Sequence, residues 1–211
     1  MNISEVQARV AALKEPESEE EFCCQVGVVS RINGVSLVKA AYLVCDLLTE
    51  RALARDGVQL ACGKGCSFCC HQMVTCTKGE WEEIHSYLLS RGMLRKQKLR
   101  FLRAKAVWLA YFACNQAALE QDPFRIIQDH LNAPCVFLNG DGSCAVYPVR
   151  PIDCRTMTST VRCTQWEGQE GASRCRYPWM AWATNLITLN GQPSGKVSVT
   201  PLPHWLATLK F

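Results

Sequence analysis

The chain has 211 residues, of which 48% are hydrophobic and 20% are charged, and its formal net charge at pH 7 is +4. This length and apolar content suit one packed domain, and so small a charge is not by itself a sign of a nucleic-acid partner. The feature that departs from ordinary composition is the 14 cysteines. Such a density usually reflects either disulfides or bound metal.

The first residues bear on which of these two explanations holds. Residues 1–21 contain no basic segment followed by an apolar run, so we expect no secretory signal. No stretch approaches the roughly 20 consecutive apolar residues that span a bilayer. We therefore expect a cytoplasmic protein that does not enter a membrane. Thiols stay reduced in the cytosol, which favours metal ligation; a disulfide framework is the alternative if the chain is exported.

Apolar residues at helical spacing predict several helices in the first half of the chain. The first two cover residues 3–14 and 35–55, and the acidic run between them, Glu15–Glu21, is expected to be solvated. The segment Thr77–Glu80 matches a capping box, in which a threonine and a glutamate satisfy each other's backbone N–H groups. It predicts a helix that starts there and ends near Gly92.

A long helix is predicted at residues 94–120, and a shorter one at 123–131. The long helix has a basic start, and a basic run on a helix usually marks a solvated face. We therefore do not expect a nucleic-acid partner. The same helix carries an apolar stripe made of Leu99, Leu102, Ala106, Leu109 and Ala113.

Short apolar runs at Pro134–Leu138 and Cys144–Tyr147 flank the turn sequence Asn139–Gly142. This pattern predicts a small cysteine-bearing β-hairpin. The prolines that follow favour irregular structure, or a helix that starts after Pro151. A last helix is expected at 178–190.

No internal repeat and no linker rich in proline and serine divides the chain. We expect a single, mostly α-helical domain, with the small hairpin and loops around a metal centre. Its parts would be an N-terminal helical segment at 1–57, a cysteine-cluster metal-binding core at 58–165 and a C-terminal extension at 166–211 packed on the core. Residues 193–203 of that extension are expected to be extended.

The first cysteine cluster reads Cys62-Gly-Lys-Gly-Cys66-Ser-Phe-Cys69-Cys70. Cysteines this close in sequence meet at small entropic cost, and the glycines let the backbone wrap tightly and aim its amides at sulfur. This spacing is a strong sign of metal ligation. Because neighbouring side chains usually point apart, either Cys69 or Cys70 is expected to ligate a different metal ion or to be structural.

A second set of cysteines lies along the predicted hairpin and the segment after it: Cys135, Cys144, Cys154 and Cys163. The hairpin could carry Cys135 and Cys144 on neighbouring strands toward the first cluster. One shared centre would then hold two distant parts of the chain together. Metal binding would be part of folding.

These motifs resemble the YkgJ-type cysteine-cluster family, described as a zinc- or iron-chelating domain with a CxxxCxxCC motif. The resemblance covers about residues 62–163. It is carried by the first cluster with Val74, Thr77 and Glu80, and by Pro134–Leu138, Gly142–Arg155, Ser159 and Cys163. The metal ligands that it implies are Cys62, Cys66, Cys69, Cys70, Cys135, Cys144, Cys154 and Cys163.

The identity of the metal stays open between two kinds of centre. Structural zinc sites usually consist of two short cysteine knuckles, whereas this chain has one compact cluster and then long gaps. Iron–sulfur clusters accept irregular spacing and ligation by thiolates alone. We therefore favour an iron–sulfur cluster, expected to be [4Fe–4S], and keep zinc as the alternative.

Three roles are compatible with such a centre: a redox or structural protein with a protein partner, iron or zinc handling, and catalysis. Some larger relatives of the resembling family are lysine N-methylases acting on flagellin, so a methylase using S-adenosylmethionine is the enzyme alternative. The segment Cys62–Cys69 also matches the radical-SAM signature. Against that interpretation, residues 79–131 predict helices without intervening strands. Whether the chain is an enzyme is left undecided.

Two arginines, Arg150 and Arg155, flank Cys154. Their guanidinium groups could neutralise a thiolate cluster or bind an anionic cofactor or substrate beside it. Alternatively, they fix this irregular loop by donating to backbone carbonyls. Cys45 and Cys114 lie in helical patterns, where a cysteine is usually a small buried hydrophobe, and are left out of the site.

Overall fold

The structure is a computed structural model, and it describes residues 12–63, 65–122, 125–129, 133–163, 177–190 and 199–209. The helix predicted at 3–14 falls almost entirely outside these residues. Cys175, whose role the sequence leaves undecided, also lies outside them. The described part of the chain is mostly helical with one small antiparallel sheet, which confirms the predicted fold class. Its elements are α2 (Glu19–Asn33), α3 (Leu37–Arg55), the 3-10 helix η1 (Phe68–His71), β1 (Thr75–Thr77), α4 (Lys78–Ser90), α5 (Met93–Lys96), α6 (Lys98–Gln121), α7 (Arg125–Asp129), the 3-10 helix η2 (Tyr147–Val149), α8 (Ile152–Arg155), α10 (Pro178–Asn190), β2 (Val199–Pro201) and α11 (Leu202–Ala207).

Helix α2 was not predicted, because the acidic run that begins it was interpreted as a solvated break. Ser18 caps the helix by accepting a hydrogen bond from the Glu21 N–H (3.2 Å). The acidic residues of the first turn then lie at the positive end of the helix dipole, which favours them. Gly34, with φ of 59°, ends the helix in the left-handed conformation.

Helices α4 and α10 were predicted closely from local signals. At the start of α4 the Thr77 hydroxyl accepts from the Glu80 N–H (3.2 Å), and the Glu80 carboxylate accepts from the Thr77 N–H (2.9 Å). This is the predicted capping box. The helix predicted at 94–120 is present as α5 and α6, separated at Gln97.

The predicted apolar stripe of α6 does not face the core. Phe101 and Trp108 are buried, whereas Leu99 and Leu109 are 61% and 49% exposed. The two aromatic side chains bury more apolar surface than leucine or alanine would, and they decide which face packs against α11.

The β structure is smaller than the predicted hairpin and lies partly elsewhere. Within the second cysteine region, the expected ladder is reduced to one antiparallel bridge between Leu138 and Cys144. The regular sheet instead joins β1 to β2, with Thr75 opposite Pro201. The extended tail expected at 193–203 is described only from residue 199; there it forms β2, and α11 follows directly.

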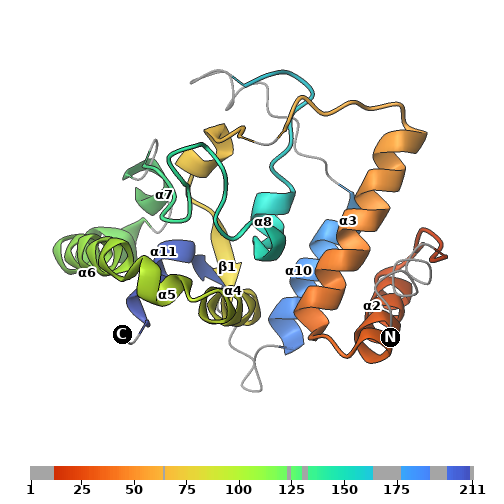
Figure 1. Cartoon of the computed structure of the whole chain (residues 1–211), viewed down its shortest axis with the longest axis horizontal. Helices are drawn as coiled ribbons and strands as arrows, with labels where there is room; N and C mark the ends of the chain where they lie inside the picture. The colour runs from red at the N-terminus through yellow and green to blue at the C-terminus, as the bar shows by residue number, and fades with distance from the viewer. Residues whose placement is uncertain are drawn as a thin grey trace.

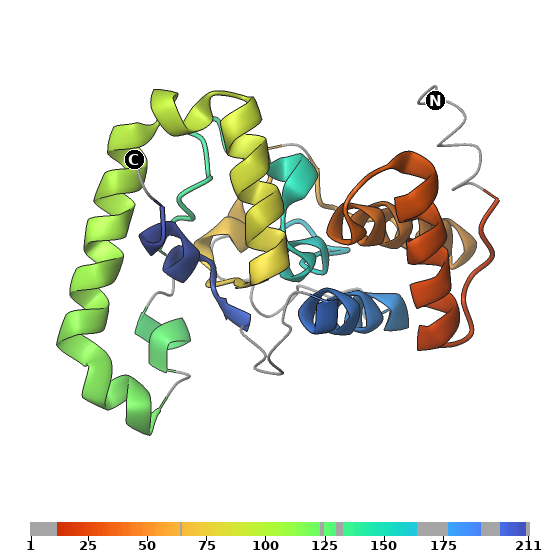
Figure 2. The same ribbon diagram turned by 90° about the horizontal axis from the view of Figure 1, so that it is seen from below.

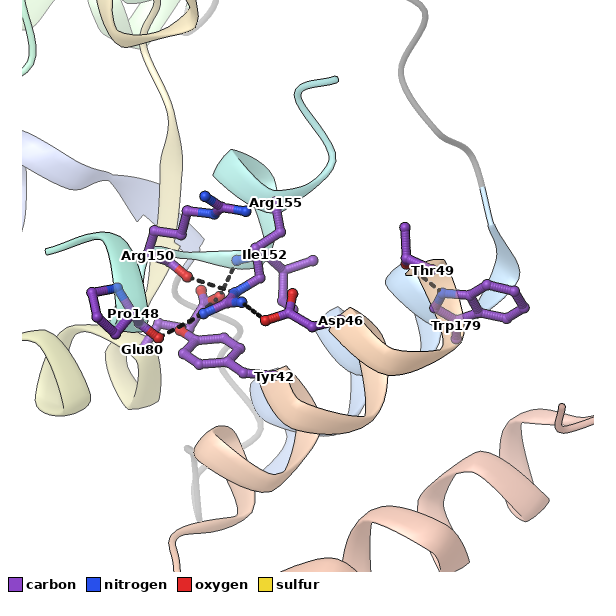
Figure 3. Close-up of polar contacts among 9 residues, drawn as sticks. All are labelled: Tyr42, Asp46, Thr49, Glu80, Pro148, Arg150, Ile152, Arg155 and Trp179. Atoms are coloured by element: carbon purple, nitrogen blue, oxygen red, sulfur yellow. Dashed lines mark hydrogen bonds and ion pairs between the residues drawn. The ribbon is translucent and has the colours of Figure 1, made fainter. Parts of the chain in front are cut away.

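Among the described residues, two hydrophobic clusters make up the core. The first joins α2, α3 and α10, which we call the three-helix bundle (Figures 1 and 2). In it the Trp179 indole N–H donates to the Thr49 hydroxyl (3.0 Å), as Figure 3 shows. Its largest fully buried side chains are Phe22, Leu48, Trp179 and Ile187.

The second cluster joins α4, α6 and α11 to the segment around Phe137 and Val146. In Figures 1 and 2, α8 lies between this part of the molecule and the three-helix bundle. The contacts agree, because Ile152 belongs to the first cluster and Cys154 packs against the second. The short helix α8 therefore connects the two cores.

Among the described residues, no single helix has both the length and the apolar character for crossing a membrane; α2 and α3 meet those criteria only together, as a pair bent by 116°.

Candidate metal centre

The first cysteine loop, residues 61–71, is bound to the second cysteine loop, residues 133–163, through their backbones. The Ala61 N–H donates to the Ser159 carbonyl oxygen (2.8 Å), and the Cys135 N–H donates to the Cys70 carbonyl oxygen (2.7 Å). Each loop can thereby satisfy polar groups that it cannot pair internally. The two motifs, far apart in sequence, therefore meet along their backbones, as the prediction of one shared centre requires.

Two glycines permit a third approach between the loops. Gly65 and Gly142 have φ angles of 87° and 79°, in the region that side chains disfavour. A Cβ placed on Gly142 would lie 2.7 Å from the Gly65 carbonyl oxygen. Only a residue without a side chain fits there.

The adjacent residues Cys69 and Cys70 both lie in the 3-10 helix η1. The Cys70 N–H donates to the Ser67 carbonyl oxygen (2.9 Å), closing a tight turn. In this turn the Cys69 and Cys70 side chains hydrogen-bond to each other. The two thiols are therefore close enough to influence each other's protonation.

The cysteines of the second loop lie near this pair. The pKa of Cys70 is raised by its hydrogen bond to Cys69, by burial and by the charges of Cys135 and Cys144. The pKa of Cys154 is raised first by burial and then by nearby charges that include Cys135 and Cys144. Thiolates in this arrangement repel one another, and a bound cation would relieve that repulsion.

The remaining predicted ligands are Cys62, Cys66 and Cys163, and Cys62 connects them electrostatically to Cys69. Its pKa is raised first by burial and then by the charges of Cys66, Cys163 and Cys69, against a hydrogen bond from the Ser159 backbone. Cys62 itself is exposed, so this end of the site faces solvent. Every predicted ligand cysteine thus interacts electrostatically with at least one other.

Cys69 differs from the others because its pKa is lowered, to about 6. The main cause is the hydrogen bond from the Cys70 thiol, and the Arg150 guanidinium contributes as well. A thiolate is the form that binds metal. Cys69 is therefore a thiol that is prepared to bind a cation at neutral pH.

Backbone N–H groups point at several of these sulfurs. Such N–H···S bonds stabilise thiolates and are common around metal–thiolate centres. The Ser159 N–H donates to Cys62 Sγ (3.1 Å), the Phe137 N–H donates to Cys135 Sγ (3.5 Å), and the Val146 backbone bonds to Cys144.

The donor set fits zinc or iron in its chemistry, being rich in thiols with amide support. Within the part of the chain that the structure describes, no group of three or more His, Cys, Asp or Glu side chains is arranged to hold a metal ion. Closing a complete ligand shell would require the thiols to converge further on the metal.

The two arginines beside Cys154 occupy different environments. Arg155 has a side chain only 3% exposed, and it donates to the carbonyl oxygens of Pro148 (2.9 Å) and Arg150 (3.0 Å) and pairs with Asp46 (Figure 3). These are the loop-fixing contacts of the structural alternative. Its role as an anion-binding residue stays a prediction.

Arg150 influences the thiols electrostatically. Its guanidinium lies over the Tyr147 ring at 3.9 Å from the centroid and lowers the pKa of both Cys69 and Cys144, though in neither is it the largest influence. Its Nε is buried, and the described residues give it no hydrogen-bond partner. Figure 3 shows its carbonyl turned toward the Arg155 guanidinium, while its own guanidinium extends in a different direction.

Cys76 was not among the predicted site residues. It is 1% exposed, and its pKa is raised mainly by burial and then by the charges of Glu80 and Cys154. Its position in β1, between two threonines that face the other way, was the available signal. Cys45 is buried, as expected, and donates to the Trp179 carbonyl oxygen (3.6 Å). Cys114 is exposed, so the expectation that it is buried was wrong: it lies on the solvent side of α6.

Comparison with known families places this region in context. The family model "CxxCxxCC: Putative zinc- or iron-chelating domain" matches residues 61–176, more than half of the chain. No curated protein and no solved structure matches the chain. The matched range contains all the predicted ligand cysteines, from Cys62 to Cys163. The chain therefore belongs to the CxxCxxCC family, and a metal-binding function is supported for its cysteine-rich region.

Proposed function

We propose that the two cysteine loops together hold an iron–sulfur cluster, with [4Fe–4S] as the favoured form and zinc as the alternative, in a redox, structural or metal-handling protein of the YkgJ type. The observation that carries the proposal is the electrostatic network of thiols, supported by backbone N–H groups that point at their sulfurs. The proposed ligands are Cys62, Cys66, Cys69, Cys70, Cys135, Cys144, Cys154 and Cys163.

The preference for an iron–sulfur cluster rests on spacing and ligand type. The donors come from one compact loop and one long loop, and they are all thiols, a pattern that clusters accept and that paired zinc knuckles do not share. Arg150 supports either centre, because a cation beside several thiolates offsets their charge.

Residues 58–165 would then be the metal-binding core, residues 1–57 an N-terminal helical segment, and residues 166–211 a C-terminal extension packed on the core. A cytoplasmic location belongs to the same proposal, because the site needs reduced thiols.

The experiment that tests this function is the measurement of iron, acid-labile sulfide and zinc per chain after purification without oxygen. Matched iron and sulfide with visible absorption would support the cluster. Zinc without sulfide would support the zinc alternative. Protein that binds neither metal, even after reconstitution with reduced thiols, would overturn the proposal.

A second candidate function is a cluster-dependent enzyme, such as a methylase that uses S-adenosylmethionine, with Arg150 and Arg155 forming an anion site. The feature that favours it is the buried Nε of Arg150, without a partner among the described residues and near Cys69 and Cys144. An anionic group of a cofactor or substrate could complete its hydrogen bonding. Turnover of S-adenosylmethionine by the reduced, metal-loaded protein, lost in Arg150→Gln, would support this role. Absence of turnover would leave the first candidate.

A further inference from the structure

The segment that carries Cys154 is held from outside the cysteine loops. Ile152, two residues before it, belongs to the hydrophobic cluster of the three-helix bundle, and Cys154 packs against the other cluster. Both residues belong to the short helix α8. A four-residue helix has little stability of its own, so its orientation depends on what holds it.

Arg155 provides one of these restraints. Its donations to the Pro148 and Arg150 carbonyl oxygens close the turn that leads into α8. Its guanidinium also lies over the Tyr42 ring, 4.1 Å from the centroid. A planar guanidinium can make these contacts at once, which fixes both ends of the segment that bears Cys154.

Asp46 on α3 is the acidic partner of this guanidinium, at a sequence separation of 109 residues. The Asp46 side chain is 53% exposed, whereas that of Arg155 is 3% exposed. Because a buried guanidinium depends on an opposite charge, Asp46 determines how firmly Arg155 stays in place. Figure 3 shows Asp46 reaching from α3 to the guanidinium, with Tyr42 one helical turn away.

A second restraint comes from α4. Glu80, 4% exposed, accepts from the Ile152 N–H (2.7 Å) and from the Tyr42 hydroxyl (3.4 Å). Helices α3 and α4 therefore hold α8 through one connected set of contacts. Among the side chains that make these contacts, Asp46 is the one exposed to solvent.

We propose that Asp46 is a positioning residue for the metal centre: acting through Arg155, it fixes the orientation of Cys154 and so couples metal retention to the packing of α3 against the cysteine loops. This inference rests on the proposed metal-binding function. It adds a residue that influences metal retention and that lies outside residues 61–176, the range that the family model matches. Asp46 is not among the proposed ligands, and its ion pair is with Arg155.

The test compares the full-length wild-type chain with Asp46→Asn. Each protein is loaded with the metal that the wild type carries, and release to a chromogenic chelator is followed under conditions where both are folded. Loss of a hydrogen-bonded support beyond the ligands commonly weakens metal sites about 10- to 100-fold, so Asp46→Asn should release metal about tenfold faster. Asp46→Glu, which restores the charge, should return the rate toward that of the wild type.

Two control variants on the same helix separate positioning from general effects. Glu50→Gln removes an exposed acidic charge one turn further along α3 and should leave release unchanged. Thr49→Val removes the acceptor of the Trp179 N–H, so it should lower the Tm without accelerating release. A direct signature is the sulfur-to-metal absorption of the loaded protein, read from the iron–sulfur cluster itself or, if the wild type holds zinc, from the cobalt(II)-substituted protein; it should change in Asp46→Asn only.

The inference is overturned, with the proposed function intact, if the wild type holds metal and Asp46→Asn shows the same release rate and the same sulfur-to-metal absorption as the wild type. It is also overturned if Thr49→Val accelerates release as much as Asp46→Asn does. A wild-type chain that binds no metal overturns both the inference and the proposed function.

Discussion

Gly142 lies so close to Gly65 that a Cβ on Gly142 would stand 2.7 Å from the Gly65 carbonyl oxygen. The two residues belong to different cysteine loops, and both have positive φ angles. Their contact is therefore a direct backbone junction between the two motifs. It is a third backbone contact between the loops, in addition to the hydrogen bonds of Ala61 with Ser159 and of Cys135 with Cys70.

Gly142→Ala should separate the two loops. The added methyl group meets backbone rather than a flexible side chain, and the φ of 79° adds strain of about 1–3 kcal/mol. We expect a lower Tm and a lower metal content than in the wild type, measured by thermal unfolding and elemental analysis. Gly140→Ala is the control, because a Cβ there has nothing within 4 Å. Equal losses in the two variants would contradict the role of the junction.

Cys66→Ser should lose metal and stability together, because a structural metal contributes its binding free energy to folding. Cys45→Ser should keep its metal. That thiol is buried in the three-helix bundle and donates only to the Trp179 carbonyl oxygen, a contact that serine can replace. Metal content and Tm, measured with and without chelator, distinguish the two variants. Full metal content in Cys66→Ser would show that the proposed ligand set is wrong.

Glu80→Ala should destabilise even the metal-free chain. It leaves the buried N–H groups of Thr77 and Ile152 without their acceptor, and each such group costs about 1–3 kcal/mol. We expect a loss of about 3 kcal/mol in the free energy of unfolding, measured by urea denaturation. Glu82→Ala is the matched control, since Glu82 makes only an exposed pair with Lys78 at 3.7 Å, worth under about 1 kcal/mol. Similar losses in both variants would count against the buried role of Glu80.

Local signals predicted the parts of this fold that depend on neighbouring residues. The capping box of Thr77 and Glu80 is a four-residue pattern, and it located the start of α4 correctly. The face that α6 buries was missed for the opposite reason. It depends on the contact of Phe101 and Trp108 with segments distant in sequence, and helical periodicity alone ranked leucine and alanine equally with them.

In the candidate site, too, some residues could be predicted from the sequence and others could not. The cysteines of the site were recognisable from their spacing. The predicted cysteines include every thiol of the electrostatic network except Cys76. The support of Cys154 was not recognisable, because Asp46 and Arg155 meet across 109 residues and neither stands in a pattern that points to the other. Contacts of this kind are set by the packing of α3 against the cysteine loops.

Metal affinity should rise with pH, and the direction follows from the thiol pKa values. Burial raises the pKa of Cys135 to about 11 and that of Cys144 above its usual value. Both are protonated thiols at neutral pH in the metal-free chain, so a metal must displace their protons. Each such proton makes the affinity increase about tenfold per pH unit. Cys69, with its pKa lowered to about 6 by the Cys70 hydrogen bond, adds little to the slope above that pH.

The measurement is a chelator competition between about pH 6 and pH 8, corrected for the protonation of the chelator itself. In Cys135→Ser the slope should fall by about one proton, because one raised thiol no longer titrates on binding. Conversely, Cys45→Ser should keep the wild-type slope, since Cys45 lies in the three-helix bundle. An affinity that stays constant over this range would mean that the bound thiols are already ionised, and it would contradict ligation by Cys135 and Cys144.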